Sequence, residues 1–391
     1  MKRNNVQFLV PEKDCTGCSA CLNACPHDSI FMAENSNGHI LPKVNQDTCS
    51  DCGYCVKICP SLRDVDVYTP IKTYAGWILD IDEHLTCTSG GVATILAKHI
   101  IANSGVVYGC TSCLGNEIKH IRVTTTEGID KLKGSKYVQS NIHYIFRQIK
   151  DDLKELTTVL FIGTPCQVAG LKNYLNSKYS NLITVALVCH GVPPQKILYD
   201  HISEICGDLN DIKLIKFREQ GRDKYTLSIE TSKGVIYKKT IFEDLYYSAF
   251  NDCLTMRESC VNCKYACVQR CEDITLGDFH QIGTKIPFNF SVKGNISLIL
   301  ANTKSGLNIL SNISRNALEL HERTLEEALE GNPQLQVSSK RRANYKLFTT
   351  LYPLLGFKSA ARIVLWRRLM KNLIIRNIIR NRLWCLIPFL L

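Results

Sequence analysis

A duplicated cysteine motif constrains the fold of the first 60 residues more than any other feature of the sequence. The spacing C-x2-C-x2-C-x3-C-P occurs over residues 15–26 and again over residues 49–60. Loops of this spacing supply three thiolates to one [4Fe–4S] cluster, while the fourth cysteine, held beyond a turn by its proline, reaches the other cluster. The motif therefore predicts two clusters with exchanged ligands. The first set is Cys15, Cys18, Cys21 and Cys59, and the second is Cys49, Cys52, Cys55 and Cys25.

Residues 8–65 are similar to the bacterial two-cluster ferredoxin module. Two zinc sites are the alternative, because C-x2-C pairs also bind zinc. An iron–sulfur cluster passes one electron at a time and offers no site for an organic substrate. We therefore expect this region to relay electrons and the substrate chemistry to lie further along the chain.

The composition points to a reduced, multidomain protein. The 391 residues suggest two or three domains at roughly 100 to 200 residues each, and 45% apolar residues are enough for a core. Twenty cysteines are about one residue in twenty, a smaller fraction than the roughly 8–10% or more of a short disulfide-rich secreted chain. The segment Met1–Pro11 lacks the unbroken apolar stretch of a signal peptide. We therefore expect a cytoplasmic protein whose clustered thiols bind metal or carry out redox chemistry.

The basic charge is concentrated in the C-terminal tail. Residues 331–391 contain twelve Lys and Arg and no acidic residue, whereas residues 1–330 contain 35 basic and 36 acidic residues, a net charge of −1. This nearly neutral part disfavours a nucleic-acid binder. The apolar residues interleaved in Ile363–Leu391 suit either peripheral contact with the inner face of a membrane or a partner protein. The apolar run Leu383–Leu391 is too short for a transmembrane helix, which needs about 20 residues.

As a helix, the tail would be amphipathic in two short segments. One face would hold Ile363, Trp366, Leu369, Met370 and Leu373, and the opposite face Arg367, Arg368 and Lys371. Arg376 and Arg380 rotate into the apolar face, so it does not persist. A terminal helix packed on the protein's own core is the alternative.

From residue 74 the chain alternates between short β-rich and helical stretches, which predicts an α/β core. The expected strands are 105–108, 158–162 and 183–188, and the expected helices are 92–102, 142–156 and 168–179. Residues 212–217, 225–231 and 235–241 are expected to be antiparallel strands that edge or extend the sheet. The predicted fold class is therefore α+β, with a small two-cluster domain at residues 1–65, an α/β domain with additional antiparallel strands at residues 74–330, and a basic helical tail at residues 331–391.

Two cysteines follow predicted strands directly. Thr164 is a plausible helix N-cap with Pro165 at the first helical position, which places Cys166 in a first turn whose N–H groups favour a thiolate, a phosphate or a flavin edge. Cys189 and His190 follow the next strand, at the edge where parallel strands form a crevice. These three residues, Cys166, Cys189 and His190, are the catalytic candidates. A buried packing cysteine and a turn histidine are the alternatives.

Two glycine-containing segments are candidate ligand cradles. Thr88-Ser89-Gly90-Gly91 opens the helix 92–102, and Lys133-Gly134-Ser135-Lys136 offers two ammonium groups beside a turn. Either could hold the pyrophosphate of a dinucleotide. The sequence has no G-x-G-x-x-G fingerprint, so a standard Rossmann nicotinamide site has no support.

A third group of cysteines lies at Cys260, Cys263, Cys267 and Cys271. On one straight helix the first and last would lie about 16 Å apart, too far to share a cubane. A third cluster therefore requires a loop, or only some of these four thiols together with a distant cysteine. Zinc and unligated thiols stay open as alternatives.

The motifs at residues 89–91, 134–140, 163–167, 189–193 and 273–278 together resemble the coenzyme F420 hydrogenase/dehydrogenase beta-subunit family, in the form with an N-terminal two-cluster ferredoxin domain. The resemblance covers about residues 8–300. It implies an iron–sulfur flavoprotein that binds FAD in its α/β domain. The positions matching the flavin side are Ser89, Gly90, Gly91, Lys136, Gly163, Thr164 and Gln167. Cys166 and Cys189 are candidates for a cluster ligand or a flavin neighbour.

The sequence thus predicts an FAD-dependent iron–sulfur oxidoreductase with two, or with the third group three, [4Fe–4S] clusters. It would pass electrons between a ferredoxin-like redox partner and a deazaflavin-type carrier or another small hydride acceptor or donor. Flavin suits this role because it accepts a hydride and releases single electrons. The alternative is an electron-transfer subunit or adaptor without its own flavin or substrate site.

Overall fold

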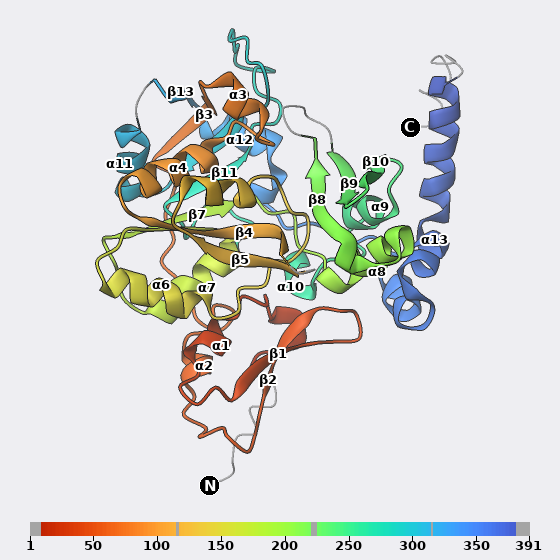
Figure 1. Ribbon diagram of the computed structural model, residues 1–391, viewed down its shortest axis with the longest axis horizontal. Coiled ribbons are helices and arrows are strands. Elements are labelled where there is room, and N and C mark those ends of the chain that lie inside the picture. Colours follow the sequence, from red (N-terminus) through yellow and green to blue (C-terminus); the bar gives the residue numbers. More distant parts are fainter. Residues whose placement is uncertain (1–8, 115–116, 220–224, 314–315, 381–391) are drawn as a thin grey trace.

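The computed structural model describes residues 9–114, 117–219, 225–313 and 316–380. The N-terminal module, red in Figure 1, contains the 3₁₀ turn Glu12–Asp14, two short helices, α1 (Ala20–Ala24) and α2 (Tyr54–Lys57), and an antiparallel hairpin of β1 (Ile30–Glu34) and β2 (Ile40–Val44).

In this module the backbone conformation repeats together with the duplicated cysteine motif. Gly17 and Asp51, which occupy equivalent positions in the two motifs, both have positive φ, and so do Ser19 and Gly53, the N-caps of α1 and α2. The left-handed region costs a non-glycine residue energy, so its use at matching positions shows that both copies form the same turn.

The main domain is built on a mixed eight-stranded sheet of order β13-β3-β12-β11-β7-β6-β4-β5. Strands β4, β6, β7 and β11 are mutually parallel in the centre, and the outer strands pair antiparallel. The strands are β3 (Lys72–Ile78), β4 (Val106–Leu114), β5 (Glu117–Val123), β6 (Val159–Gly163), β7 (Leu182–Leu187), β11 (Ile274–Asp278), β12 (Ser297–Ala301) and β13 (Leu318–Arg323).

Helices cover both faces of this sheet (Figure 1), and alternation along the strands explains why. Phe161 of β6 belongs to the core beneath α6 (Ile145–Lys154) and α7 (Pro165–Leu175), whereas its neighbour Leu160 belongs to the core beneath α4 (Val92–Ala102) and α11 (Lys304–Asn312). The predicted fold class is confirmed, and the predicted bounds of helix 92–102 are those observed. Shorter elements complete the domain, namely α3 (Ile81–Leu85), α5 (Thr126–Ile129), the 3₁₀ turn Asp130–Leu132, α12 (Leu325–Gly331) and the 3₁₀ turn Pro333–Leu335.

The additional antiparallel strands do not extend the main sheet, contrary to the prediction. β8 (Ile212–Arg218), β9 (Tyr225–Thr231) and β10 (Gly234–Thr240) form a separate three-stranded sheet of order β10-β9-β8. The edge strands of the main sheet are β5 and β13, and within the described part of the chain none of these three strands pairs with either of them. The small sheet has its own core with the helices α8 (Gln195–Cys206), α9 (Leu245–Asn251) and α13 (Tyr345–Arg380).

The tail forms α13 (Tyr345–Arg380), which runs along one side of the molecule (Figure 1) and is interrupted at Gly356, where φ is 73°. One face of α13, including Phe357, Ala361 and Val364, is buried in the core of the small sheet, so packing on the protein's own core accounts for that face. No helix among the described residues is long and apolar enough to cross a membrane. The described part of the chain does not include Leu383–Leu391 or the side chains of Leu373, Arg376 and Arg380.

Candidate metal centres

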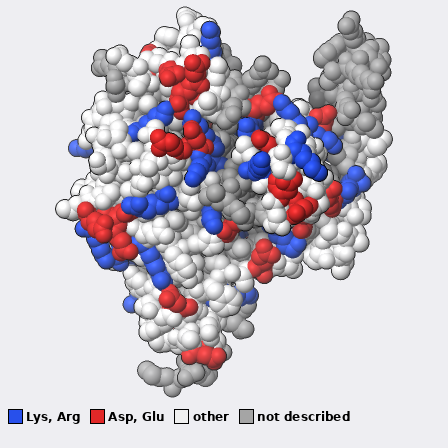
Figure 2. All heavy atoms as spheres, in the orientation of Figure 1, with Lys and Arg blue, Asp and Glu red and all other residues white. Residues whose placement is uncertain are grey.

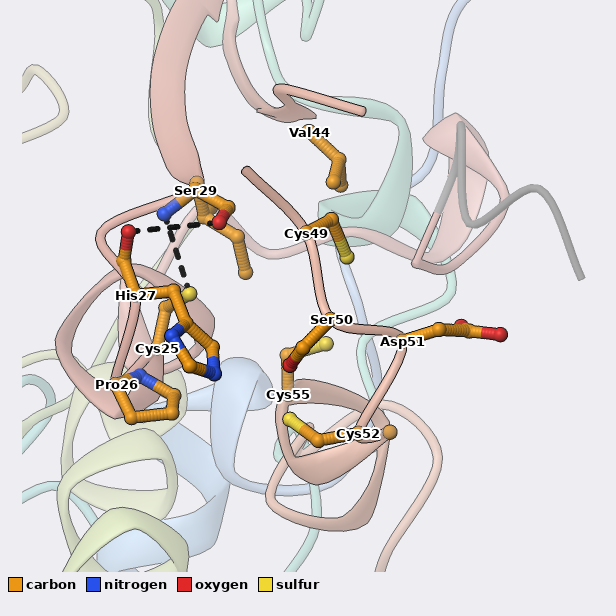
Figure 3. A pocket seen from close by; sticks show the side chains of 12 residues that line it. Cys25, Pro26, His27, Ser29, Val44, Cys49, Ser50, Asp51, Cys52 and Cys55 are labelled. Atoms are coloured by element: carbon orange, nitrogen blue, oxygen red, sulfur yellow. Dashed lines mark hydrogen bonds between the residues drawn. The ribbon is translucent and has the colours of Figure 1, made fainter. Parts of the chain in front are cut away.

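The first of three cysteine-lined cavities lies within the N-terminal module. Cys49, Cys52 and Cys55 line it together with Cys25 from the other copy of the motif. Figure 3 shows their sulfur atoms facing a common space. The amide of Ser29 donates to Cys25 Sγ at 3.3 Å. Cys52 is exposed, so this cavity opens toward the surface. The structure thus brings together the predicted second set.

The second cavity is lined by Cys15, Cys18, Cys21 and Cys59, the predicted first set. Burial raises the pKa of Cys18 to about 12, and the nearby Cys59 and Cys15 thiols add to the effect. Cys15 and Cys59 are buried as well and Cys21 is partly buried, and four such sulfurs can be thiolates together only with a positively charged group among them. This donor set fits an iron–sulfur cluster.

The third cavity assembles four cysteines from separate segments. Cys166 and Cys189 follow the neighbouring parallel strands β6 and β7, and Cys260 and Cys263 lie in and just after α10 (Glu258–Val261). The carboxyl ends of adjacent parallel strands meet at one sheet edge, which places the first two thiols side by side. The charges of Cys189, Cys263 and Cys260 all act to raise the pKa of Cys166, as its burial does.

Cys267 and Cys271, two of the four candidate ligands in the third group, do not line this cavity. The Cys267 thiol donates to the carbonyls of Lys264 at 3.4 Å and Gln269 at 3.1 Å, and the Cys271 thiol donates to the carbonyl of Pro165 at 3.6 Å. After α10 the chain has no further helix up to Cys271, so the four thiols do not follow one face. Cys260 and Cys263 instead line the cavity together with Cys166 and Cys189, which are distant in the sequence.

Arg270 is the residue in this cavity that the sequence interpretation missed. Its side chain is buried and bonded to Glu272 at 2.8 Å, yet its Nη2 has no hydrogen-bond partner among the described residues. A buried N–H without an acceptor is costly, and sulfur atoms of a cluster would satisfy it. The signal in the sequence that could have identified this residue was the single arginine among the cysteines of residues 260–271.

No three His, Cys, Asp or Glu side chains in the described residues close on one point as a single metal ion requires. Each cysteine set surrounds an open volume instead, of about 390, 350 and 580 Å³ including the mouth of the cavity.

His190 is not arranged as a base for Cys166 or Cys189. Its Nδ1 lies 3.2 Å from Gln334 Nε2 and 3.0 Å from Ser339 Oγ, and its Nε2 lies 3.8 Å from Cys253 Sγ. Burial raises the pKa of Cys189 to about 12, which opposes a nucleophilic thiolate. The geometry supports Cys189 and Cys166 as cluster ligands and His190 as a residue held by its neighbours.

The candidate flavin residues separate into two groups. Thr164 and Gln167 form a capping box at the start of α7, with the Thr164 amide donating to Gln167 Oε1 at 2.9 Å. Gln167 Nε2 donates to the carbonyl of Ser140, and Gly163 packs on Phe161. These three residues position Cys166. Lys136 Nζ donates to the carbonyls of Cys110, Leu132 and Lys133 at 2.7–2.9 Å, so its three donors are already used.

The two candidate cradles lie next to each other. Thr88 Oγ1 is 3.1 Å from Ser135 Oγ, and Lys133 Nζ donates to Thr86 Oγ1 at 2.9 Å. Ser89 Oγ lies 3.1 Å from Ser297 Oγ. Gly90 faces the main sheet so closely that a Cβ atom would lie 2.2 Å from the carbonyl oxygen of Gly76, and Gly91 has φ of 79°. Packing and backbone conformation alone thus require both glycines.

The three cavities are arranged in series. α1 carries Cys21 of the second cavity, and Cys25 of the first follows directly after this helix. Thr16 lines both the second and the third cavity. Tyr265, which lines the third cavity, donates a hydrogen bond to the carbonyl of Pro60, which lines the second cavity. The second cavity therefore lies between the other two.

Comparison with protein families identifies two regions of the chain. Residues 156–326 match the family described as the C terminus of the beta subunit of coenzyme F420 hydrogenase/dehydrogenase, and residues 14–62 match the 4Fe-4S dicluster domain. The third cavity takes Cys166, Cys189, Cys260 and Cys263 from the first region, whereas the loops 88–91 and 133–136 lie outside both.

Several proteins share parts of this sequence. The 4-hydroxyphenylacetate decarboxylase activating enzyme of Clostridium scatologenes is 40% identical over 152 residues, 37% of this chain and 46% of that protein. The ketoisovalerate oxidoreductase subunit VorC of Methanothermobacter marburgensis is 28% identical over 62 residues, 15% of this chain and 78% of that protein. The chain thus spans less than half of the Clostridium protein. A chain of the F420-reducing [NiFe] hydrogenase complex of Methanosarcina barkeri superposes with a TM-score of 0.44 and 16% identity, covering 68% of this chain and 90% of that one.

Proposed function

We propose that this chain, an iron–sulfur protein with a C-terminal region of the coenzyme F420 hydrogenase/dehydrogenase beta-subunit family, is an oxidoreductase that moves electrons through three [4Fe–4S] clusters. The observation that carries the proposal is the series of three cavities, each lined by four cysteines. A cluster in each would form a continuous path from the exposed Cys52 to the main domain. The exposed end is the place for a ferredoxin-like redox partner.

The chain's own residues shape this path. Burial of the middle set excludes water, and the capping box of Thr164 and Gln167 fixes Cys166 at the start of α7. Arg270 contributes a buried positive charge at the third cavity, where four thiolates would otherwise repel one another. A fixed charge of this kind needs no reorganisation when an electron arrives.

FAD is the proposed two-electron partner of the relay, and it would supply hydride exchange with a deazaflavin-type carrier or another small substrate. The adjoining loops 88–91 and 133–135 would hold it, with Thr88, Ser135 and the N-terminus of α4 as polar groups. Lys136 does not fit this role, because all its donors are bonded to carbonyls. That observation favours the second candidate function, an electron-transfer adaptor without a flavin.

The test is anaerobic purification followed by iron, acid-labile sulfide, zinc and released-flavin analysis on one sample. We expect about twelve irons, an equal amount of sulfide and one FAD per chain, because each cubane holds four irons. About eight irons would contradict the third cluster, and stoichiometric zinc would contradict iron at that site. Full iron without flavin, even after incubation with FAD, would establish the adaptor instead of the flavoenzyme.

We also propose that α13 contacts an anionic membrane surface. Opposite its buried face, Ile363, Trp366 and Met370 are 47%, 56% and 49% exposed, and they fall within about 60° of one another around the helix. Arg362 and Arg367 flank this stripe, as the basic residues of interfacial helices do. Leu369, predicted on the same face, packs against the core, and Arg368 pairs with Asp252.

The face of the molecule seen in Figure 2 lacks such a bias. Figure 2 shows Lys and Arg interspersed with Asp and Glu over the visible face of the molecule. We expect the intact protein to co-sediment with vesicles of phosphatidylglycerol and phosphatidylcholine, and the double variant I363D/W366D to bind at least about tenfold more weakly, since burial of two such side chains is lost. The control is Leu156→Asp, at a residue that is 84% exposed on the main domain. Equal binding by wild type and the double variant would refute this contact.

A further inference from the structure

Arg257 is a fully buried arginine without an acidic partner. Its side chain is 1% exposed. Its Nε and Nη2 donate to Gln139 Oε1 at 3.2 and 2.7 Å, its Nη2 also donates to the carbonyl of Ile40 at 2.8 Å, and its Nη1 donates to the carbonyl of Cys15 at 3.3 Å. All these acceptors are neutral, and no ion pair with a carboxylate forms within the described part of the chain.

Such a charge requires compensation. Removing a guanidinium from water without an opposite charge is strongly unfavourable, even when its hydrogen bonds are made. The acceptors around Arg257 supply dipoles but no negative charge. The cysteine sets of the second and third cavities can supply that charge, because a cubane with four thiolate ligands has a net negative charge.

Arg257 lies between the second and third cavities. On one side it contacts Cys15, and its charge acts to lower the pKa of that thiol. On the other side its backbone amide donates to the carbonyl of Val192, which lines the third cavity, and its charge acts to lower the pKa of Cys260. Gln139 joins the two sides, because its Nε2 donates to the carbonyl of Gly17 at 3.2 Å while its Oε1 accepts from Arg257.

We propose that Arg257 is a positioning residue at the step between the two adjacent clusters, where its buried charge raises the reduction potential of both. The inference rests on the proposed function, since it requires clusters in both cavities. In the step concerned one electron leaves one cluster, which is oxidised, and enters the other, which is reduced. No bond forms or breaks and no proton moves, so the local electrostatic field governs the equilibrium of the step.

Arg147 provides a matched control. It also joins the N-terminal module to the main domain, and it donates to the carbonyls of Asn23 at 2.9 Å and Cys25 at 3.0 Å. Unlike Arg257, it pairs with Asp28 at 2.6 Å, and its side chain is 33% exposed. Its charge is neutralised and screened by solvent, so its removal should hardly change the potential of the neighbouring cluster.

The experiment is a redox titration of the intact holoprotein, followed by electron paramagnetic resonance, with iron content measured on each sample. In Arg257→Met we expect the ratio of reduced to oxidised cluster at a fixed potential to fall about tenfold for the two adjacent clusters, equivalent to about 59 mV for one electron. Arg257→Lys and Arg147→Met should stay within about threefold of wild type.

A second variant covers the case in which Arg257→Met does not fold. Gln139→Glu keeps the arginine and the shape of the contact, but it places a carboxylate against the guanidinium. It should lower the same two potentials. Unchanged potentials in Gln139→Glu, or in Arg257→Met, with twelve irons bound would overturn the role of Arg257. Wild-type protein with fewer than twelve irons would instead count against the proposed third cluster, so the two failures are distinguishable.

Discussion

Replacement of Cys189 by alanine is expected to lower the iron content from about twelve to about eight atoms per chain, because the cubane in the third cavity loses one of its four ligands. Cys260→Ala should have the same effect, since both thiols line the third cavity. Cys267→Ala should leave about twelve irons, because its thiol is bonded to the carbonyls of Lys264 and Gln269 outside that cavity.

The comparison of Cys260 with Cys267 is well matched. Both belong to the same short segment, and both are half-buried, so differences in folding or oxidation should be small. Iron and sulfide analysis of anaerobic samples gives the result, with visible absorbance as an independent measure. Loss of four irons in Cys267→Ala together with full iron in Cys189→Ala would establish a ligand set within residues 260–271 and refute the one proposed from the structure.

The second large effect concerns stability. Lys136→Met removes the ammonium that three carbonyl groups share, those of Cys110, Leu132 and Lys133. Each carbonyl left without a donor costs about 1–3 kcal/mol. A total loss of about 3 kcal/mol or more should lower Tm by about 6–12 °C for a domain of this size, measured by circular dichroism under anaerobic conditions.

The control for this variant is Lys131→Met. Lys131 is exposed and precedes the same loop, so its replacement should change Tm by no more than about 1–2 °C. Bound flavin per folded chain should be equal in both variants. A Lys136→Met protein with wild-type Tm that binds no FAD would show that Lys136 contacts the cofactor and would reverse the structural assignment.

Features determined by short stretches of sequence were predictable. The duplicated motif indicated the two N-terminal cysteine sets, since the spacing and the prolines are local. The helix 92–102 was predicted with its observed bounds because glycine precedes it and its apolar positions recur with helical spacing. Cys166 was placed correctly in a first helical turn, because Thr164 and Pro165 mark the start of α7.

Features that depend on tertiary neighbours were not predictable. In the third cavity, Cys166 and Cys189 lie together with Cys260 and Cys263. This grouping depends on the pairing of β6 with β7 and on the course of the chain after α10. Lys136 looked like a phosphate ligand because no local signal shows the three carbonyls around it. The strands at residues 212–240 have an ordinary antiparallel pattern. Such a pattern does not tell whether strands join the main sheet or form a sheet of their own.

The exchange of Cys25 and Cys59 between the two motifs has a consequence for assembly. Three thiols of each set come from one copy and the fourth from the other, so neither copy can complete its own cluster. During synthesis Cys15, Cys18 and Cys21 emerge before Cys59, and they must wait, reduced and unligated by a fourth thiol, until the second copy has left the ribosome. Neither N-terminal cluster can thus be completed before both copies have been synthesised, and a chain truncated between the copies would retain no complete set for either cluster.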